Sequence, residues 1–189
     1  MSSETKFFSR YSLTPEVSEG RRSFELSDTT SGRIGYVAGK VGERLYRLFS
    51  LHSEGKLKSE QYNCHGLSRY LQGKTKLPEY PDFIEKSEFG NETTVDQATE
   101  SLHFPIGVHV LPDRRVSETG NILGSHSGTI LGRREDGTLF AIQKFGPERL
   151  EICDPNAIIR YGAGVQPNFF GKRKLTLRNI KRALGVDIV

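Results

Sequence analysis

Residues 61–73 read QYNCHGLSRYLQG and predict a short helix that carries a cysteine in its first turn. Asn63 is a favourable N-cap residue, apolar residues follow at helical spacing, and Gly73 is typical of the position after a helix. A thiol at a helix N-terminus lies among amide groups without intrahelical partners, which favours the thiolate. Cys64 is therefore a candidate nucleophile, and the alternative is a buried structural cysteine.

A second stretch predicts a β-hairpin. Residues 124–132 read GSHSGTILG, residues 138–146 read TLFAIQKFG, and the turn between them ends in Asp-Gly. We expect His126 to open the first strand of this hairpin. A cysteine on a helix and a histidine on a strand, distant in sequence, are the pair that nucleophilic thiol catalysis requires.

The two motifs resemble the NlpC/P60-like branch of the papain-like cysteine peptidase superfamily. In that family the cysteine opens a helix after an asparagine, as in NCHGL at residues 63–67, and the histidine opens a strand, as in HSGTILG at residues 126–132. The resemblance covers residues 61–152. It implies an α+β fold with a papain-like core, in which the catalytic cysteine at a helix N-terminus packs on an antiparallel β-sheet.

The third catalytic position in this family is often His, Asn or Gln, and the candidate here is Gln143. A glutamine can accept a hydrogen bond from the imidazole N–H and orient the ring, although it cannot stabilise an imidazolium as a carboxylate does. The cysteine is followed by His65 and Gly66, where peptidoglycan-cleaving members commonly have Ser-Gly. This departure from the family pattern weakens the expectation of a peptidoglycan substrate more than the expectation of thiol chemistry.

The register of the hairpin decides whether Gln143 can serve this role. If paired residue numbers sum to about 269 or 271, as with Arg133 opposite Thr138, Gln143 shares the sheet face of His126. An even sum would place Lys144 there instead. Lysine cannot accept a hydrogen bond from imidazole, so we predict the odd sum.

These residues predict an acyl-transfer site without a metal or cofactor. The Cys64 thiolate attacks a carbonyl carbon, His126 moves the proton, and Gln143 orients the ring. The Cys64 backbone N–H is one expected oxyanion donor, and the resemblance suggests a second at Gln61 or Tyr62. Such an enzyme is a cysteine hydrolase or an acyltransferase acting on an amide or ester bond. Its partner is a peptide, protein or lipid-like substrate with an acyl group, and the alternative function is a catalytically inactive papain-like interaction module.

The domain prediction divides the chain at residue 32. Residues 1–32 are polar with interspersed aromatic residues, and we expect a partly ordered extension whose aromatic side chains attach it to the body. Residues 33–189 are expected to form a single catalytic domain. Within it, residues 74–102 are a long loop that either shapes a substrate groove or is a surface insertion, and residues 176–185 predict a helix.

Charge and composition limit the partners and the compartment. The net charge is +4, spread along the chain, and no nucleic-acid-binding motif is present. No apolar run is long enough to span a membrane, and no secretory signal pattern is seen. The two cysteines form neither a disulfide framework nor a metal-binding spacing. We expect a cytoplasmic protein, with export by another route and the oligomeric state left open.

Overall fold

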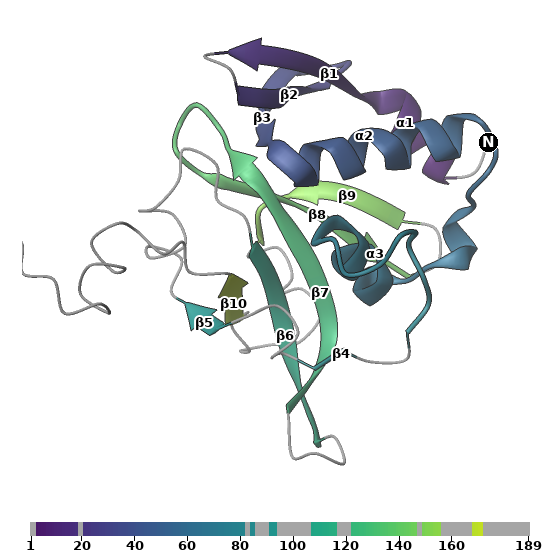
Figure 1. Ribbon diagram of the computed structural model, residues 1–189, viewed down its shortest axis with the longest axis vertical. Helices are drawn as coiled ribbons and strands as arrows, with labels where there is room; N and C mark the ends of the chain where they lie inside the picture. Colours follow the sequence, from purple (N-terminus) through teal and green to yellow (C-terminus); the bar gives the residue numbers. More distant parts are fainter. Residues whose placement is uncertain are drawn as a thin grey trace, which may run out of the picture.

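The computed structural model describes residues 3–18, 21–81, 84–85, 91–93, 107–116, 122–146, 149–155 and 168–171. These residues form a mixed α+β fold with two antiparallel sheets (Figure 1). In this part of the chain the helices are α1 (Ser3–Arg10), α2 (Gly39–Ser53), the 3-10 helix η1 (Ser59–Gln61) and α3 (Cys64–Leu71). The strands are β1 (Tyr11–Ser18), β2 (Arg21–Asp28), β3 (Gly32–Ala38), β4 (Ile84–Glu85), β5 (Asn91–Thr93), β6 (Gly107–Val116), β7 (Ile122–Arg133), β8 (Leu139–Phe145), β9 (Arg149–Cys153) and β10 (Asn168–Gly171).

The first sheet contains β1, β2 and β3 in that order. Composition predicts a partly ordered extension over residues 1–32, whereas the described residues of this region form α1, β1 and β2. The reason is an alternation of apolar side chains that the polar composition hides. Leu13 and Leu26 are cross-strand partners, and both are buried together with Phe24.

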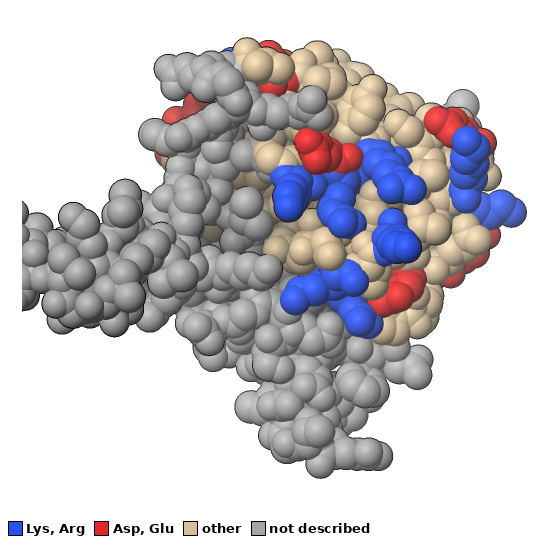
Figure 2. Space-filling model, viewed as in Figure 1, with Lys and Arg blue, Asp and Glu red and all other residues tan. Residues whose placement is uncertain are grey.

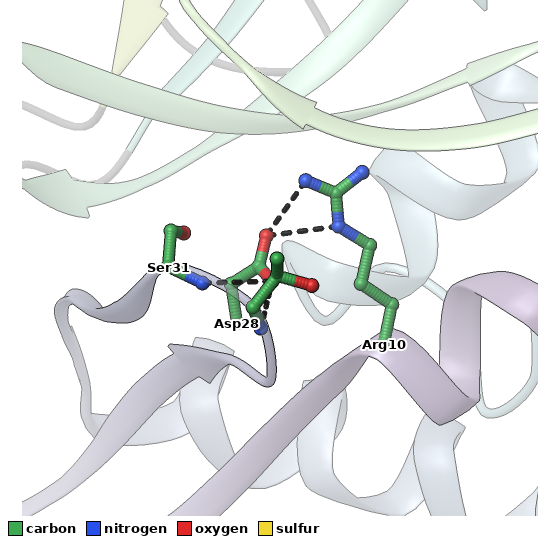
Figure 3. Close-up of polar contacts among 4 residues, drawn as sticks. Arg10, Asp28 and Ser31 are labelled. Carbon is green, nitrogen blue, oxygen red and sulfur yellow. Dashed lines mark hydrogen bonds and ion pairs between the residues drawn. The ribbon is translucent and has the colours of Figure 1, made fainter.

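Asp28, at the end of β2, ties this sheet to α1 (Figure 3). Its Oδ2 atom accepts a hydrogen bond from Arg10 Nε at 2.8 Å, and its Oδ1 atom accepts from the backbone N–H groups of Thr30 at 2.8 Å and Ser31 at 3.4 Å. The bond from Arg10, followed by that from Thr30, lowers the pKa of Asp28 to about 2. One carboxylate therefore closes the β2–β3 turn and holds the helix.

The second sheet has the order β5-β10-β6-β7-β8-β9, with β4 paired to β7. The predicted hairpin is confirmed as β7 and β8. His126 does not open its strand as expected, because pairing with β6 extends β7 back to Ile122. The histidine therefore lies inside a strand that has neighbours on both sides.

The predicted cysteine helix is confirmed as α3, which packs on β7 (Figure 1). Asn63 is its N-cap and accepts from Gly66 N at 2.9 Å, and Gly73 follows the helix with φ of 79°. Helix α2 contacts α3 and the first sheet, and it buries Val41 and Leu45.

Residues 72–81 cross α3 at very short range. A Cβ atom at position 66 would lie 1.6 Å from the carbonyl oxygen of Glu79, so only glycine permits this approach. Asn63 strengthens the crossing, because its Nδ2 group donates to Pro81 O at 2.6 Å and its backbone N–H donates to Glu79 O at 3.3 Å. The start of the predicted loop 74–102 is thereby fixed beside the first turn of α3.

One buried apolar cluster joins both sheets and the helices. It includes Phe7 and Leu26 from the N-terminal region together with Leu67 and Ile142 from the second half, so the core does not divide at residue 32. The expected helix at residues 176–185 and residues 94–102 of the predicted loop lie outside the described residues. Within the described part, no helix has the length and apolar character needed to cross a bilayer.

Candidate functional site around Cys64 and His126

Cys64 is the first residue of α3, and it is partly exposed. Burial raises the pKa of its thiol above the usual value. Hydrogen bonds from the backbone N–H groups of Ser127, His65 and Cys64 itself, and the positive charge of Lys144, act in the opposite direction. The amide donors of the helix N-terminus favour the thiolate, as expected, but desolvation outweighs them and the net shift of the pKa is upward.

Ser127 connects the cysteine helix to β7. Its hydroxyl donates to the carbonyl oxygen of Cys64 at 3.1 Å, and it lies 3.0 Å from His65 Nδ1. Because the hydroxyl proton is used on Cys64, His65 Nδ1 carries a proton and donates to Ser127 Oγ. His65 is buried and is a fixed part of the helix–sheet contact.

His126 and Gln143 lie on the same face of the hairpin, as the predicted register requires. Gly128 is paired with Gln143, which corresponds to a sum of 271, and the register shifts only nearer the turn, after Ile130. His126 Nε2 lies 3.3 Å from Gln143 Oε1 across the diagonal. The prediction that Gln143 rather than Lys144 faces His126 is confirmed.

The contact with Gln143 determines the tautomer of His126. A carbonyl oxygen can only accept, so His126 Nε2 carries the proton and Nδ1 is the basic nitrogen of the neutral ring. Burial lowers the pKa of His126 to about 4, although the bond to Gln143 acts against this shift. The ring also stacks on Phe145, with centroids 5.1 Å apart. On its other side, the Gln143 amide donates to Cys153 Sγ at 3.3 Å.

The structure does not join Cys64 to His126 directly. Neighbouring residues of a strand point to opposite faces, so the His126 ring lies on the face of β7 opposite the Ser127 hydroxyl that contacts α3. Both Cys64 and His126 are described, and no hydrogen bond connects these two side chains. The Ser127 backbone N–H nevertheless contributes to lowering the pKa of the Cys64 thiol, so the thiol lies near the backbone between residues 126 and 127.

The face that α3 covers carries a lysine that sequence reasoning did not assign to the site. Lys144 is fully buried, and its Nζ atom lies 2.6 Å from Ser59 Oγ and 4.7 Å from the centroid of the Tyr62 ring. Burial, and then the charge of Lys144, lower the pKa of His52 to about 4. The sequence FAIQKF in β8 could have predicted this buried lysine, because a strand that is buried on both faces must bury every side chain, including Lys144.

The side chains expected at the oxyanion position are engaged elsewhere. Gln61 Oε1 accepts from the backbone N–H of Lys58 at 2.7 Å, and the hydroxyl of Tyr62 lies 3.0 Å from His52 Nε2. The Cys64 backbone N–H, the other expected donor, is among the groups that lower the pKa of the thiol, together with the backbone N–H groups of His65 and Ser127.

Two further observations concern ligands. A hollow of about 310 Å³ between α1 and β9 is lined by Arg10, Arg149 and neighbouring residues, and neither Cys64 nor His126 lines it. Among the residues that the structure describes, no group of three or more His, Cys, Asp or Glu side chains could hold a metal ion.

Comparisons of the chain with protein-family models, with curated proteins and with solved structures found no match. A functional assignment therefore depends on the residues and on the geometry described above.

Proposed function

We propose that the chain is a cysteine hydrolase or acyltransferase on a papain-like, NlpC/P60-like core, which acts on an amide or ester bond. Cys64 is the nucleophile, His126 the general base and Gln143 the group that orients it. The observation that carries the proposal is the His126–Gln143 contact at 3.3 Å, because it leaves Nδ1 of a neutral imidazole as the proton acceptor. A thiol nucleophile needs a reducing compartment, so the proposal includes a cytoplasmic location.

The proposed reaction begins from a thiol and a neutral imidazole. The raised pKa of Cys64 and the lowered pKa of His126 favour this pair over thiolate and imidazolium. As the sulfur–carbon bond forms, the thiol proton moves to His126 Nδ1, and the same proton then goes to the departing amine or alcohol. Water, an amine or an alcohol next attacks the thioester, gives its proton to Nδ1 and releases the acyl group, while the thiolate takes that proton back.

Backbone amides supply the stabilisation of the oxyanion in this proposal. The N–H groups of Cys64, His65 and Ser127 lower the pKa of the thiol, and the proposal requires at least one of them to donate to the substrate carbonyl oxygen, where the oxyanion develops. Removal of one such donor typically costs about 10²-fold or more in rate. Because the donors are main-chain groups, neither Gln61 nor Tyr62 is needed for this role.

A catalytically inactive interaction module on the same fold is the second candidate. It is favoured by the position of the His126 ring on the sheet face opposite the α3 contact, and by the hydrogen-bond partner that this ring already has in Gln143. The catalytic proposal requires β7 to rearrange around residue 126 when substrate binds, because rotation of the side chain alone cannot carry the His126 ring through a strand that is paired on both sides. The module requires no such motion.

Acyl transfer to the protein separates the two candidates. The full chain is incubated with p-nitrophenyl acetate, p-nitrophenolate release is followed, and the acetylated residue is located by peptide mass spectrometry. We expect acetylation of Cys64, with loss of release in Cys64→Ala, a large decrease in His126→Ala and little change in Cys153→Ser. If Cys153 is acetylated first, or if wild type and Cys64→Ala release p-nitrophenolate equally, the enzyme proposal is wrong and the inactive interaction module is favoured.

A further inference from the structure

A basic surface lies over α2, α3 and the segment that follows α3. Figure 2 shows Lys and Arg side chains gathered on this face of the molecule, with fewer acidic side chains between them. We define the basic surface by six residues: Lys40, Arg44, Arg47, Arg69, Lys74 and Lys76.

Contacts between the elements hold these residues on one surface. On α2, residues 40, 44 and 47 recur at the spacing of one helix face. Arg44 Nη1 donates to Tyr70 O and to Thr75 O, both at 2.9 Å, which joins this face to the end of α3 and to the segment after it. Arg47 also lies near the Tyr70 hydroxyl, where its charge acts against the burial that raises the pKa of Tyr70.

Acidic residues compensate only part of this charge. Glu79 forms an ion pair with Arg69 at 2.9 Å, and Glu43 lies on the exposed face of α2 between the basic residues. Six basic residues and two acidic residues leave an excess of four positive charges, which equals the net charge of the whole chain, +4. A local excess of this size attracts an anionic partner at low ionic strength.

Two apolar side chains project from the same segment as Lys74 and Lys76. Leu77 is 49% exposed and Tyr80 is 61% exposed. An aliphatic side chain cannot stack on a nucleic acid base, but it can enter the acyl region of a bilayer, and tyrosine is favoured at the membrane–water interface. Basic residues beside projecting apolar residues therefore fit an anionic lipid surface better than a nucleic acid.

We propose that the basic surface, with Leu77 and Tyr80, binds peripherally to a bilayer that contains anionic lipids. The basic side chains contact the lipid headgroups, while Leu77 and Tyr80 enter the interface between headgroups and acyl chains. The bound segment runs from the end of α3 back to its N-cap, where Glu79 and Pro81 contact Asn63. This binding does not depend on the proposed catalysis.

Vesicle co-sedimentation of the full chain tests the proposal. Vesicles of phosphatidylcholine with phosphatidylserine should bind the protein, vesicles of phosphatidylcholine alone should not, and binding should weaken as salt is added. Each basic residue near an anionic membrane contributes about fivefold in affinity, so the double variant Lys74→Ala, Lys76→Ala should bind about 30-fold more weakly. Leu77→Ser should also weaken binding, with the fold checked by circular dichroism.

The matched control is the double variant Lys56→Ala, Lys58→Ala, which removes the same charge from the segment between α2 and η1, outside the six residues that define the basic surface. It should bind like the wild type. Equal weakening in both double variants, or no binding to anionic vesicles at low salt, would overturn the proposal. Salt-dependent binding of single-stranded RNA, measured by fluorescence anisotropy, together with no binding to vesicles would overturn it in favour of a nucleic acid.

Discussion

The two faces of the β7–β8 hairpin carry different polar groups although they are formed by the same few residues. One face holds Ser127 and Lys144 and is covered by α3 with Cys64. The other holds His126 and Gln143, with Cys153 beside them. All four hairpin side chains are buried.

The difference shows how the period of a strand separates neighbours in sequence. Residues 126 and 127 are adjacent, as are residues 143 and 144, yet each pair is divided between the faces. The proposed base and its orienting residue thus share one environment, while the nucleophile shares the other with a buried lysine. Variants of each face can show which of the two environments carries chemistry.

The largest expected effect is on the rate of acyl transfer. His126→Ala removes the base and should lower the rate about 10³-fold, while Gln143→Ala removes only an orienting contact and should cost about 10²-fold. Lys144→Met, on the opposite face, should change the rate far less, once folding has been verified. The measurement is p-nitrophenyl ester turnover for the three variants side by side.

The opposite ranking of the variants would place the catalytic partner of Cys64 on the face that α3 covers. If Lys144→Met is inactive but folded and Gln143→Ala is silent, then the partner of Cys64 lies on the face covered by α3, and His126 has a structural role.

The next effect is on stability at low pH. The pKa of His126 is about 4 in the folded protein, below its ordinary value of 6.5, because burial disfavours the charged ring. The unfolded chain therefore binds the proton first, so stability is full above pH 6.5 and declines as the pH falls from 6.5 to 4. For His126 the total loss should be roughly 3 kcal/mol, measured by urea unfolding.

Substitution of each histidine in turn shows how much of this pH dependence comes from each face of the hairpin. His126→Asn should show a shallower decline in the free energy of unfolding. His52→Asn, on the α3 side, should show the same direction with a smaller change, because His52 is only partly buried and its charge is screened by solvent. If His126→Asn declines as steeply as the wild type, the folded His126 ring is as easily protonated as the unfolded one, and the pH dependence has another origin.

The smallest expected effects concern how α3 is seated on its face. Gly66→Ala places a Cβ atom 1.6 Å from Glu79 O, so residues 79–81 must move, and the free energy of unfolding should fall by about 2 kcal/mol. The matched control is Ser68→Ala in the same helix. The Ser68 hydroxyl is buried and has no hydrogen-bond partner among the described residues, so its removal should cost nothing measurable.

These two substitutions also separate the faces. Gly66→Ala should change the alkylation rate of Cys64 by iodoacetamide, because it shifts the first turn of α3, and it should leave the His126 ring signals in NMR spectra in place. Changes in both would mean that the faces are coupled through β7.

The fold was predictable where the signal is local. Asn63 and Gly73 delimit α3 because capping and positive φ depend on adjacent residues. The strand period places His126 and Gln143 on one face, as expected, but the turn did not set this register. The turn pairs Arg133 with Leu139, an even sum, and the register shift after Ile130 restores the odd sum at Gln143. Strands β1 and β2 of the first sheet were missed, because their alternating apolar residues lie in a polar composition, and the burial of this sheet against α1 and α2 involves distant residues.

By itself, the sequence determined the cysteine helix, the hairpin and the candidate residues Cys64, His126 and Gln143. The tertiary structure alone decided which face of β7 the cysteine helix covers, and therefore that Ser127 rather than His126 contacts it. It also decided that burial raises the pKa of Cys64, against the local effect of the helix N-terminus. The physical reason is that helix caps and strand periods act over a few residues, whereas desolvation and face-to-face packing depend on chain segments far apart in sequence.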